Sequence, residues 1–244
     1  GPTLWWGLSL AFFGAVFTLM ARQTEQNIAG AFQGTPFEQI INTFTGGAAI
    51  GSGVWFLSLI FTELPLVFTI YALIQASNWA EDEENGRFEL LLANPQARWR
   101  VLLARYAAFV TSLLVIAAAL LLAVVLAAIQ QELPLDGGKV VAAVAGMLPI
   151  ALVVASVGYL LSGWLRSGAV TGVLATLLAL SFLDELVGAI FKWPDWVVQL
   201  SLFERYGTPF TKGLDWTNVV ALLAVAAGAL TLAIWRFSQK DIAH

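Results

Sequence analysis

Charged residues are concentrated in one short stretch of an otherwise apolar chain. The 244-residue sequence is 59% hydrophobic and 11% charged, yet a run of four acidic residues is followed closely by an arginine and three leucines. Glu83 and Arg87 stand four residues apart, the favourable order for an acid and a base on one helix. Phe88, Leu91 and Leu92 follow at the spacing of a single apolar stripe. This combination predicts non-covalent docking by an amphipathic helix.

The sequence also indicates where this helix ends. Asn94-Pro95 stops it, because the residue before a proline avoids the α-helical region, and the same pair can begin the next helix. We therefore expect a helix over residues 81–93. A helix lying on the bilayer surface is the alternative, but anionic lipid would favour a basic face. The acidic start fits better with a protein partner that offers a groove and basic residues.

Composition argues against several other kinds of chemistry. The chain has no cysteine, and its one histidine is His244, so thiolate, disulfide, Ser-His and histidine metal chemistry are not expected. No glycine-rich loop followed by Lys-Ser/Thr is present to bind a nucleotide. The net charge of −4 does not suggest nucleic-acid binding. An intramembrane protease is a weak alternative, because Glu83-Glu84 precedes Arg87 by one residue too few for a Glu-Glu-x-x-x-Arg motif.

One further acid, Glu63, lies inside an apolar stretch. An ionisable group there costs about 2–3 kcal/mol if it is central in a membrane. Glu63 could line a cavity and contact a cationic substrate or another helix. Alternatively, it lies near the outer water layer or is protonated beside Thr62 and Pro65. An ion-coupled secondary transporter that uses Glu63 as a proton carrier is also an alternative, although the sequence shows no internal repeat of the kind common in that class.

Long apolar runs predict the elements that position these residues. The mean hydropathy is +0.81, and a membrane-spanning helix needs roughly 20 mostly apolar residues. Backbone groups in lipid must be satisfied within a segment, so the runs are helices. We expect an all-α integral membrane protein with six transmembrane helices. The predicted spans are residues 4–21, 51–76, 101–129, 140–165, 169–183 and 219–235.

Six spans place both termini and the charged stretch on one side of the membrane. That side has slightly more lysine and arginine than the other, which favours the cytoplasm. Residues 22–50 and 184–218 are then external loops, with Asp184-Glu185 at the external end of the fifth span. The ten tryptophans fall near predicted span ends, where indole prefers the membrane interface. The fourth span is expected to be loosened by Gly146, Pro149, Gly158 and Gly163.

The charged stretch resembles a motif of a known family. EDEENGRFELLLANPQAR is similar to the segment after the second span of type-2 permeases of bacterial ATP-binding-cassette exporters. GYLLSGWLRSGAVTGVLA, LSLFERYGTPFTKGLDW and IWRFSQKDIA resemble later parts of the same family, most closely its exporters of drug-like and polyketide-antibiotic substrates. The resemblance implies that residues 1–244 are one transmembrane permease domain. The chain opens Gly-Pro, and the family's elbow helix does not precede the first span, as expected for a trimmed start.

The resemblance also implies what the charged stretch does. In this family it is a coupling helix, here residues 81–94, that docks in a groove of a separate ATPase subunit. ATP and Mg²⁺ would bind that subunit, with no cofactor on this chain, and two permease halves would form a 12-helix unit in a bacterial or archaeal cytoplasmic membrane. The residues implied in coupling are Glu83, Glu84, Gly86, Arg87, Phe88, Glu89, Leu90, Leu91, Leu92, Pro95 and Arg98.

Overall fold

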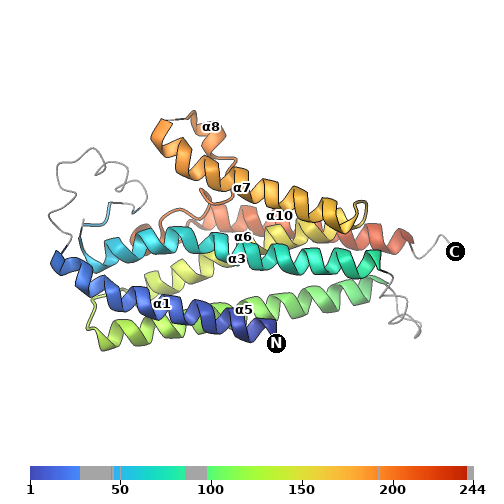
Figure 1. Ribbon diagram of the computed structural model, residues 1–244. Coiled ribbons are helices and arrows are strands. Elements are labelled where there is room, and N and C mark those ends of the chain that lie inside the picture. Colours follow the sequence, from blue (N-terminus) through green and yellow to red (C-terminus); the bar gives the residue numbers. More distant parts are fainter. Residues whose placement is uncertain (28–44, 46, 50, 86–97, 192, 241–244) are drawn as a thin grey trace.

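Six long helices make up most of the molecule (Figure 1). The computed structural model describes residues 1–244 except 28–44, 46, 50, 86–97, 192 and 241–244. All six helices are long and apolar enough to cross a membrane, which confirms the predicted all-α fold with six candidate spans. They are α1 (Pro2–Asn27), α3 (Gly53–Glu84), α5 (Arg98–Gln130), α6 (Gly137–Ser162), α7 (Ser167–Phe191) and α10 (Trp216–Lys240).

Two helices extend further than the sequence indicated. Residues 81–84 belong to the last turn of α3, so the expected separate helix over 81–93 does not begin at Glu81. The helix that contains the fifth predicted span does not end at Asp184-Glu185, because α7 continues to Phe191. Both differences have one cause: a helix keeps its backbone hydrogen bonds after it leaves the apolar layer, whereas hydropathy marks only that layer. The segment after α7 is also partly helical, with α8 (Asp195–Val198) and α9 (Pro209–Lys212).

α6 lies at the centre of the bundle. Its most apolar window is 67% buried, compared with 28% in α1 and α7 and 22% in α10. It packs against α3 and α10, while α1 lies along α5. Figure 1 shows the C-terminal end of α7 and α8 standing away from the other helices. The apolar surface of α1, α7 and α10 is therefore left for lipid or another protein to cover.

Glycines bring neighbouring helices close together. A Cβ atom on Gly158 of α6 would overlap Cβ of Ala76 on α3 and lie 2.9 Å from Cδ1 of Leu174 on α7. A Cβ on Gly14 of α1 would lie 2.5 Å from Cδ1 of Leu120 on α5. Gly158 thus permits tight packing of α6 against α3 and α7, a role that the sequence alone did not indicate. Neither Gly168 nor Gly172 has such a neighbour, in line with ordinary glycine usage in membrane helices.

Polar caps fix where three of the helices begin. The Ser52 hydroxyl accepts a hydrogen bond from the Trp55 amide at the start of α3. Asp136 does the same for the first amides of α6, and Asp215 for those of α10. A cap satisfies amide groups that have no partner inside the helix. Each of these helices therefore starts at a residue that the local sequence specifies.

The tryptophans divide into two groups. Trp5, Trp196 and Trp216 are exposed near helix ends, as expected for side chains at a membrane interface. Trp55 and Trp79 are only 3% and 2% exposed and belong to the protein core. Position near a span end therefore did not decide which way a tryptophan points. Trp79 packs where three spans meet, beneath the charged stretch.

Candidate functional site

The last turn of α3 is tied to the first turns of α5. We call this end of the bundle, where α3 ends and α7 begins, the Glu84 end. Asp82 of α3 forms a salt bridge of 2.5 Å with the Arg105 guanidinium of α5. The same guanidinium lies 5.6 Å from the centre of the Trp79 ring, within the range of a cation–π interaction. The two helices that flank residues 86–97 are therefore joined by direct contact.

Trp79 connects this pair to α6 and α10. Its indole N–H donates a hydrogen bond of 3.0 Å to the buried Ser162 hydroxyl. Its ring stacks on Tyr159 of α6 at 5.0 Å and meets the edge of Phe237 of α10 at 5.8 Å. The buried indole is thus both packed and hydrogen-bonded. Movement of the α3 C-terminus must displace residues of α6 and α10 as well.

Glu84 connects α3 to α7. Its Oε2 atom accepts two hydrogen bonds from Ser167, one of 2.9 Å from the backbone N–H and one of 2.6 Å from the hydroxyl. Ser167 is the first residue of α7, so the carboxylate caps a helix that begins 83 residues later in the chain. A negative charge at a helix N-terminus is also favoured by the helix dipole. Glu84, Arg166 and Trp164 line a cavity of about 280 Å³ at this junction.

Part of the predicted coupling site lies outside the described residues. Glu83 and Glu84 lie in the last turn of α3 and are among the described residues. Arg98 is the first residue of α5, but its side chain is not described. The remaining predicted residues fall in 86–97, outside the part that the structure describes: Gly86, Arg87, Phe88, Glu89, Leu90, Leu91, Leu92 and Pro95.

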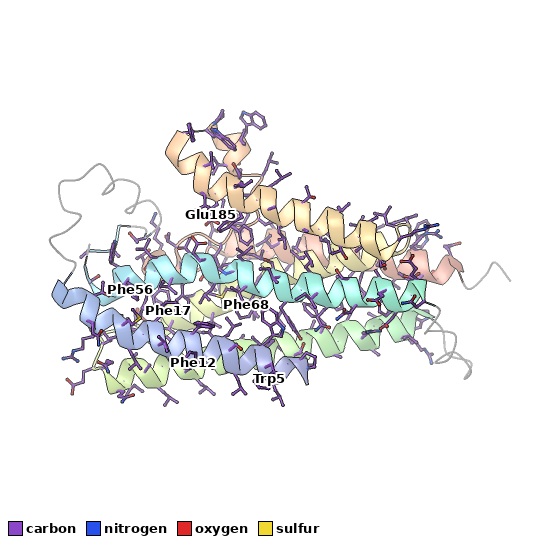
Figure 2. All side chains as sticks on the ribbon, viewed as in Figure 1. Trp5, Phe12, Phe17, Phe56, Phe68 and Glu185 are labelled. Carbon is purple, nitrogen blue, oxygen red and sulfur yellow. The ribbon has the colours of Figure 1, made fainter. Side chains whose placement is uncertain are left out.

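Carboxylates gather toward the opposite end, which we call the Glu185 end, where α3 begins and α7 ends. Glu63 is exposed on α3, and Glu185 of α7 lies within its electrostatic reach. Figure 2 shows Glu185 on the side of α7 that faces the rest of the bundle. Asp184 and Glu204 are also close enough to interact with Glu185. Glu63 is therefore one member of a group of acids, a grouping that the sequence did not indicate.

Burial changes the acid–base behaviour of the segment after α7. It raises the pKa of the Glu204 carboxyl above its ordinary value of 4.5; the negative charge of Asp184 raises it further, and Arg205 opposes the shift. Burial also raises the pKa of Tyr206, with a smaller contribution from Glu185. The Tyr206 hydroxyl donates a 2.9 Å hydrogen bond to the Ala143 carbonyl of α6. This segment is thus fixed to the bundle while it holds acids in a poorly solvated environment.

A comparison with known families identifies the chain. The family model described as "Multidrug efflux system permease Rv1217c, C-terminal domain" matches residues 1–238. The chain belongs to this permease family. No curated protein sequence matches it. The match covers nearly the whole chain and all six candidate spans, so the two ends described above are parts of one family domain.

The sequence of this permease did not indicate the partners of its charged residues. Arg105 and Ser167 contact the α3 C-terminus from 23 and 83 residues further along the chain. The one available signal was that Arg105 is the last charge before a long uncharged run, which marks it as a residue at a span entrance. Nothing in the local sequence brings Glu204 to Glu185.

The two ends can support different chemistry. The contacts at the Glu84 end are suited to transmitting displacement between helices, because each links α3 to a different span. The acids at the Glu185 end are suited to attracting positive charge. No group of three or more histidine, cysteine or acidic side chains is arranged to hold a metal ion within the described part of the chain. Both ends fit a transport subunit, in line with the match to a permease family.

Proposed function

We propose that this chain is the membrane-spanning permease subunit of an ATP-driven exporter. It moves an amphipathic, drug-like or antibiotic-like substrate out of the cytoplasm or the inner leaflet, with energy from a separate ATPase subunit of the ATP-binding-cassette class. Membership of a multidrug efflux permease family and six candidate spans support this function. The chain would lie in a bacterial or archaeal cytoplasmic membrane with both termini in the cytoplasm.

The observation that carries this proposal is the linkage at the base of the charged stretch. The last turn of α3 is joined to α5 by Asp82–Arg105, to α6 by Trp79–Ser162 and to α7 by Glu84–Ser167. A partner that pushes or pulls residues 81–97 therefore acts on four spans together. A loop that only faces solvent would not require these contacts. A coupling segment requires them, because they transmit its movement to the spans.

A second permease half completes the proposed transport unit. The outward faces of α1, α7 and α10 expose large apolar side chains, among them Phe12, Leu180 and Val220. Lipid covers such surface, and so does a partner helix. A 12-helix unit made from two copies, or from this chain and a similar half, would enclose a substrate pathway between the halves.

The function is tested by co-purification and ATP-dependent transport. The permease is expressed with a candidate ATPase subunit of the ATP-binding-cassette class from the same source, captured through a tag on the permease, and placed in lipid vesicles. We expect the ATPase to co-purify, and substrate to move only when ATP is hydrolysed. A matched ATPase that binds but cannot hydrolyse ATP serves as the control. Failure of the ATPase to co-purify, or transport that does not respond to ATP, contradicts the proposal.

The orientation is tested on the same cysteine-free chain. Single cysteines at Leu90 and Lys240 are labelled with a reagent that does not cross the membrane. We expect labelling only after the membrane is opened. Labelling of either cysteine in intact cells contradicts a cytoplasmic location of the coupling segment and the C-terminus.

The closeness of Glu63 and Glu185 favours a second candidate, an ion-coupled secondary transporter. The titrations of two acids within electrostatic reach are coupled, so one of them can hold a proton and release it when a cationic cargo binds. A proton gradient without ATP would then drive transport, and an uncoupler would stop it. ATP-driven transport that persists in the presence of an uncoupler excludes this candidate.

A further inference from the structure

A cavity of about 460 Å³ opens at the Glu185 end. Its walls come from separate parts of the chain: Thr62 of α3, Glu185 and Gly188 of α7, Val198 of α8, and the segment from Phe203 to Asn218. Cavities of this size commonly hold small organic ligands. The Tyr206–Ala143 hydrogen bond fixes one wall to α6, so the cavity is part of the folded bundle.

The charges around this cavity are predominantly negative. Glu185 and Glu204 line it, and neither carboxylate forms a hydrogen bond or ion pair with another described residue. Asp215 also lines it, but its carboxylate is occupied in capping α10. Lys212 is the basic residue of the described lining and is exposed to solvent.

The neighbouring Arg205 does not neutralise the acids of the lining. Its guanidinium donates hydrogen bonds to Asn218 Oδ1 at 3.1 Å and to the Gln199 carbonyl at 3.2 Å. With Glu63 and Asp184 in electrostatic reach, the acids near the cavity exceed the bases. The cavity therefore carries a negative potential.

The Asp184 carboxylate, which does not itself line the cavity, is a second observation that points to a positively charged ligand. Its side chain is only 7% exposed, and both carboxylate oxygens lack a hydrogen-bond partner among the described residues. A buried carboxylate without a partner is strongly unfavourable. Its Oδ1 atom lies 3.4 Å from the position that a Cβ on Gly188 would take, and Gly188 lines the cavity. The absent side chain at Gly188 thus leaves the carboxylate close to the cavity wall.

The lining favours an organic cation over a metal ion. A metal site needs several ligands converging on one point, and the described acids are not arranged that way. Phe203, Tyr206 and Val198 supply an apolar and aromatic surface beside the carboxylates. Aromatic rings and dispersed acids together suit a cation that carries apolar groups.

We propose that this cavity binds an organic cation with apolar substituents, and that such cations are substrates of the permease. Glu185 and Glu204 would face the positive charge directly, and Asp184 would add to the attraction from behind Gly188. The assignment of the ligand as a substrate rests on the proposed export function, whereas binding to the cavity does not.

Binding is measured on the purified full chain in detergent, without the ATPase. Tetraphenylphosphonium is the probe, and tetraphenylborate, of the same shape and opposite charge, is its matched control. We expect the cation to bind at least about tenfold more tightly than the anion, because the uncompensated carboxylates attract one and repel the other. Equal binding of the two ions overturns the proposal, as does displacement of the cation by Mg²⁺ at equimolar concentration.

Variants separate this cavity from the rest of the chain. Glu185→Gln and Glu204→Gln keep the side-chain shape and should each weaken cation binding severalfold, while Glu132→Gln, at an exposed turn of the same end, should not. Asp184→Asn should raise the thermal stability of the empty protein, since it removes an unpaired buried charge, and should reduce the stabilisation that the cation gives. Unchanged binding in all three cavity variants overturns the proposal, as does a loss of stability in Asp184→Asn without any effect on binding.

Failure of the cation-binding proposal can be distinguished from failure of the proposed export function. If the ATPase does not co-purify but cation binding depends on Glu185 and Glu204, the cavity stands and the export mechanism fails. If ATP-driven transport of a neutral substrate is normal and no cation binds, the export mechanism stands and the cavity assignment fails.

Discussion

Asp82 and Glu84 at one end of this permease have different surroundings from Asp184 at the other end. At the Glu84 end, Asp82 is paired with Arg105, and Glu84 accepts two hydrogen bonds from Ser167. At the Glu185 end, both oxygens of Asp184 lack a hydrogen-bond partner among the described residues. A carboxylate that accepts hydrogen bonds from a neighbouring helix helps to hold the two helices together. A buried carboxylate without hydrogen bonds lowers the stability of the fold, so its presence calls for another explanation, such as binding a ligand. The difference separates a structural junction from a surface suited to a ligand.

The largest effect is expected from a change in the charged stretch itself. Leu91→Asp puts a charge into the apolar stripe, and burying it in a partner's groove would cost several kcal/mol. We expect loss of ATPase capture with normal cation binding at the Glu185 end. Arg87→Glu reverses the charge of the residue that the sequence predicts to pair with Glu83, and should leave capture partly intact while hydrolysis no longer drives transport. Pull-down, hydrolysis and transport are measured on the same preparations. Normal capture and transport in both variants would show that the stretch is a solvated loop.

The next largest effect concerns the packed indole beneath the salt bridge. Trp79→Ala removes the stacking on Tyr159 and leaves the Ser162 hydroxyl without its donor. We expect a loss of about 3–5 kcal/mol in the free energy of unfolding, measured by denaturant titration in detergent. Trp5→Ala, at a side chain that is 74% exposed, is the control and should change stability by less than about 0.5 kcal/mol. Similar losses in both variants would contradict a core role for Trp79.

A smaller effect is expected from the salt bridge. The Arg105 and Asp82 side chains are 38% and 19% exposed, so solvent screens their attraction. A double-mutant cycle with Asp82→Asn and Arg105→Gln should give a coupling energy of about 0.5–1 kcal/mol in stability. The same single variants should reduce ATP-driven transport more than they reduce ATPase capture, because the pair joins the two helices that flank the coupling segment. If the effects of the two substitutions on stability and on ATP-driven transport were additive, the Asp82–Arg105 pair would have no role in coupling.

The smallest expected effect is the contribution of Glu204, at the Glu185 end, to the pH dependence of folding stability. Because burial raises the pKa of Glu204 in the folded protein above its ordinary 4.5, the folded state holds that proton more tightly than the unfolded state. The associated stability is fully present below the unfolded pKa and is lost as pH rises through the raised folded pKa. Glu204→Gln should flatten this part of the stability–pH curve, while Glu132→Gln should leave it unchanged. An unchanged slope in Glu204→Gln would contradict the burial effect.

Hydropathy was sufficient to predict the fold but not the contacts between its helices. The six apolar runs correspond to the six candidate spans, because helices are the main structure that lipid admits. The Glu84–Ser167 bond joins residues 83 positions apart, and the acids at the Glu185 end come from α3, α7 and the segment before α9. Such pairings depend on which helix faces packed together, and hydropathy gives the same value whichever way a helix is rotated. The buried Trp79 shows this most clearly, since its sequence position suited a membrane interface equally well.

The close approach of Gly158 to Ala76 has a mechanical consequence. Where α6 and α3 meet, no side-chain layer separates the two backbones, so there is little room for them to slide or rotate independently. We therefore expect the two helices to move together at this contact, which lies along α3 between Glu84 at one end and Thr62 in the wall of the acidic cavity at the other. A tilt of the two helices by a few degrees about the Gly158 contact would shift their two ends in opposite directions. Gly158→Leu should therefore disturb transport even though this glycine lies away from both the docking segment and the cavity.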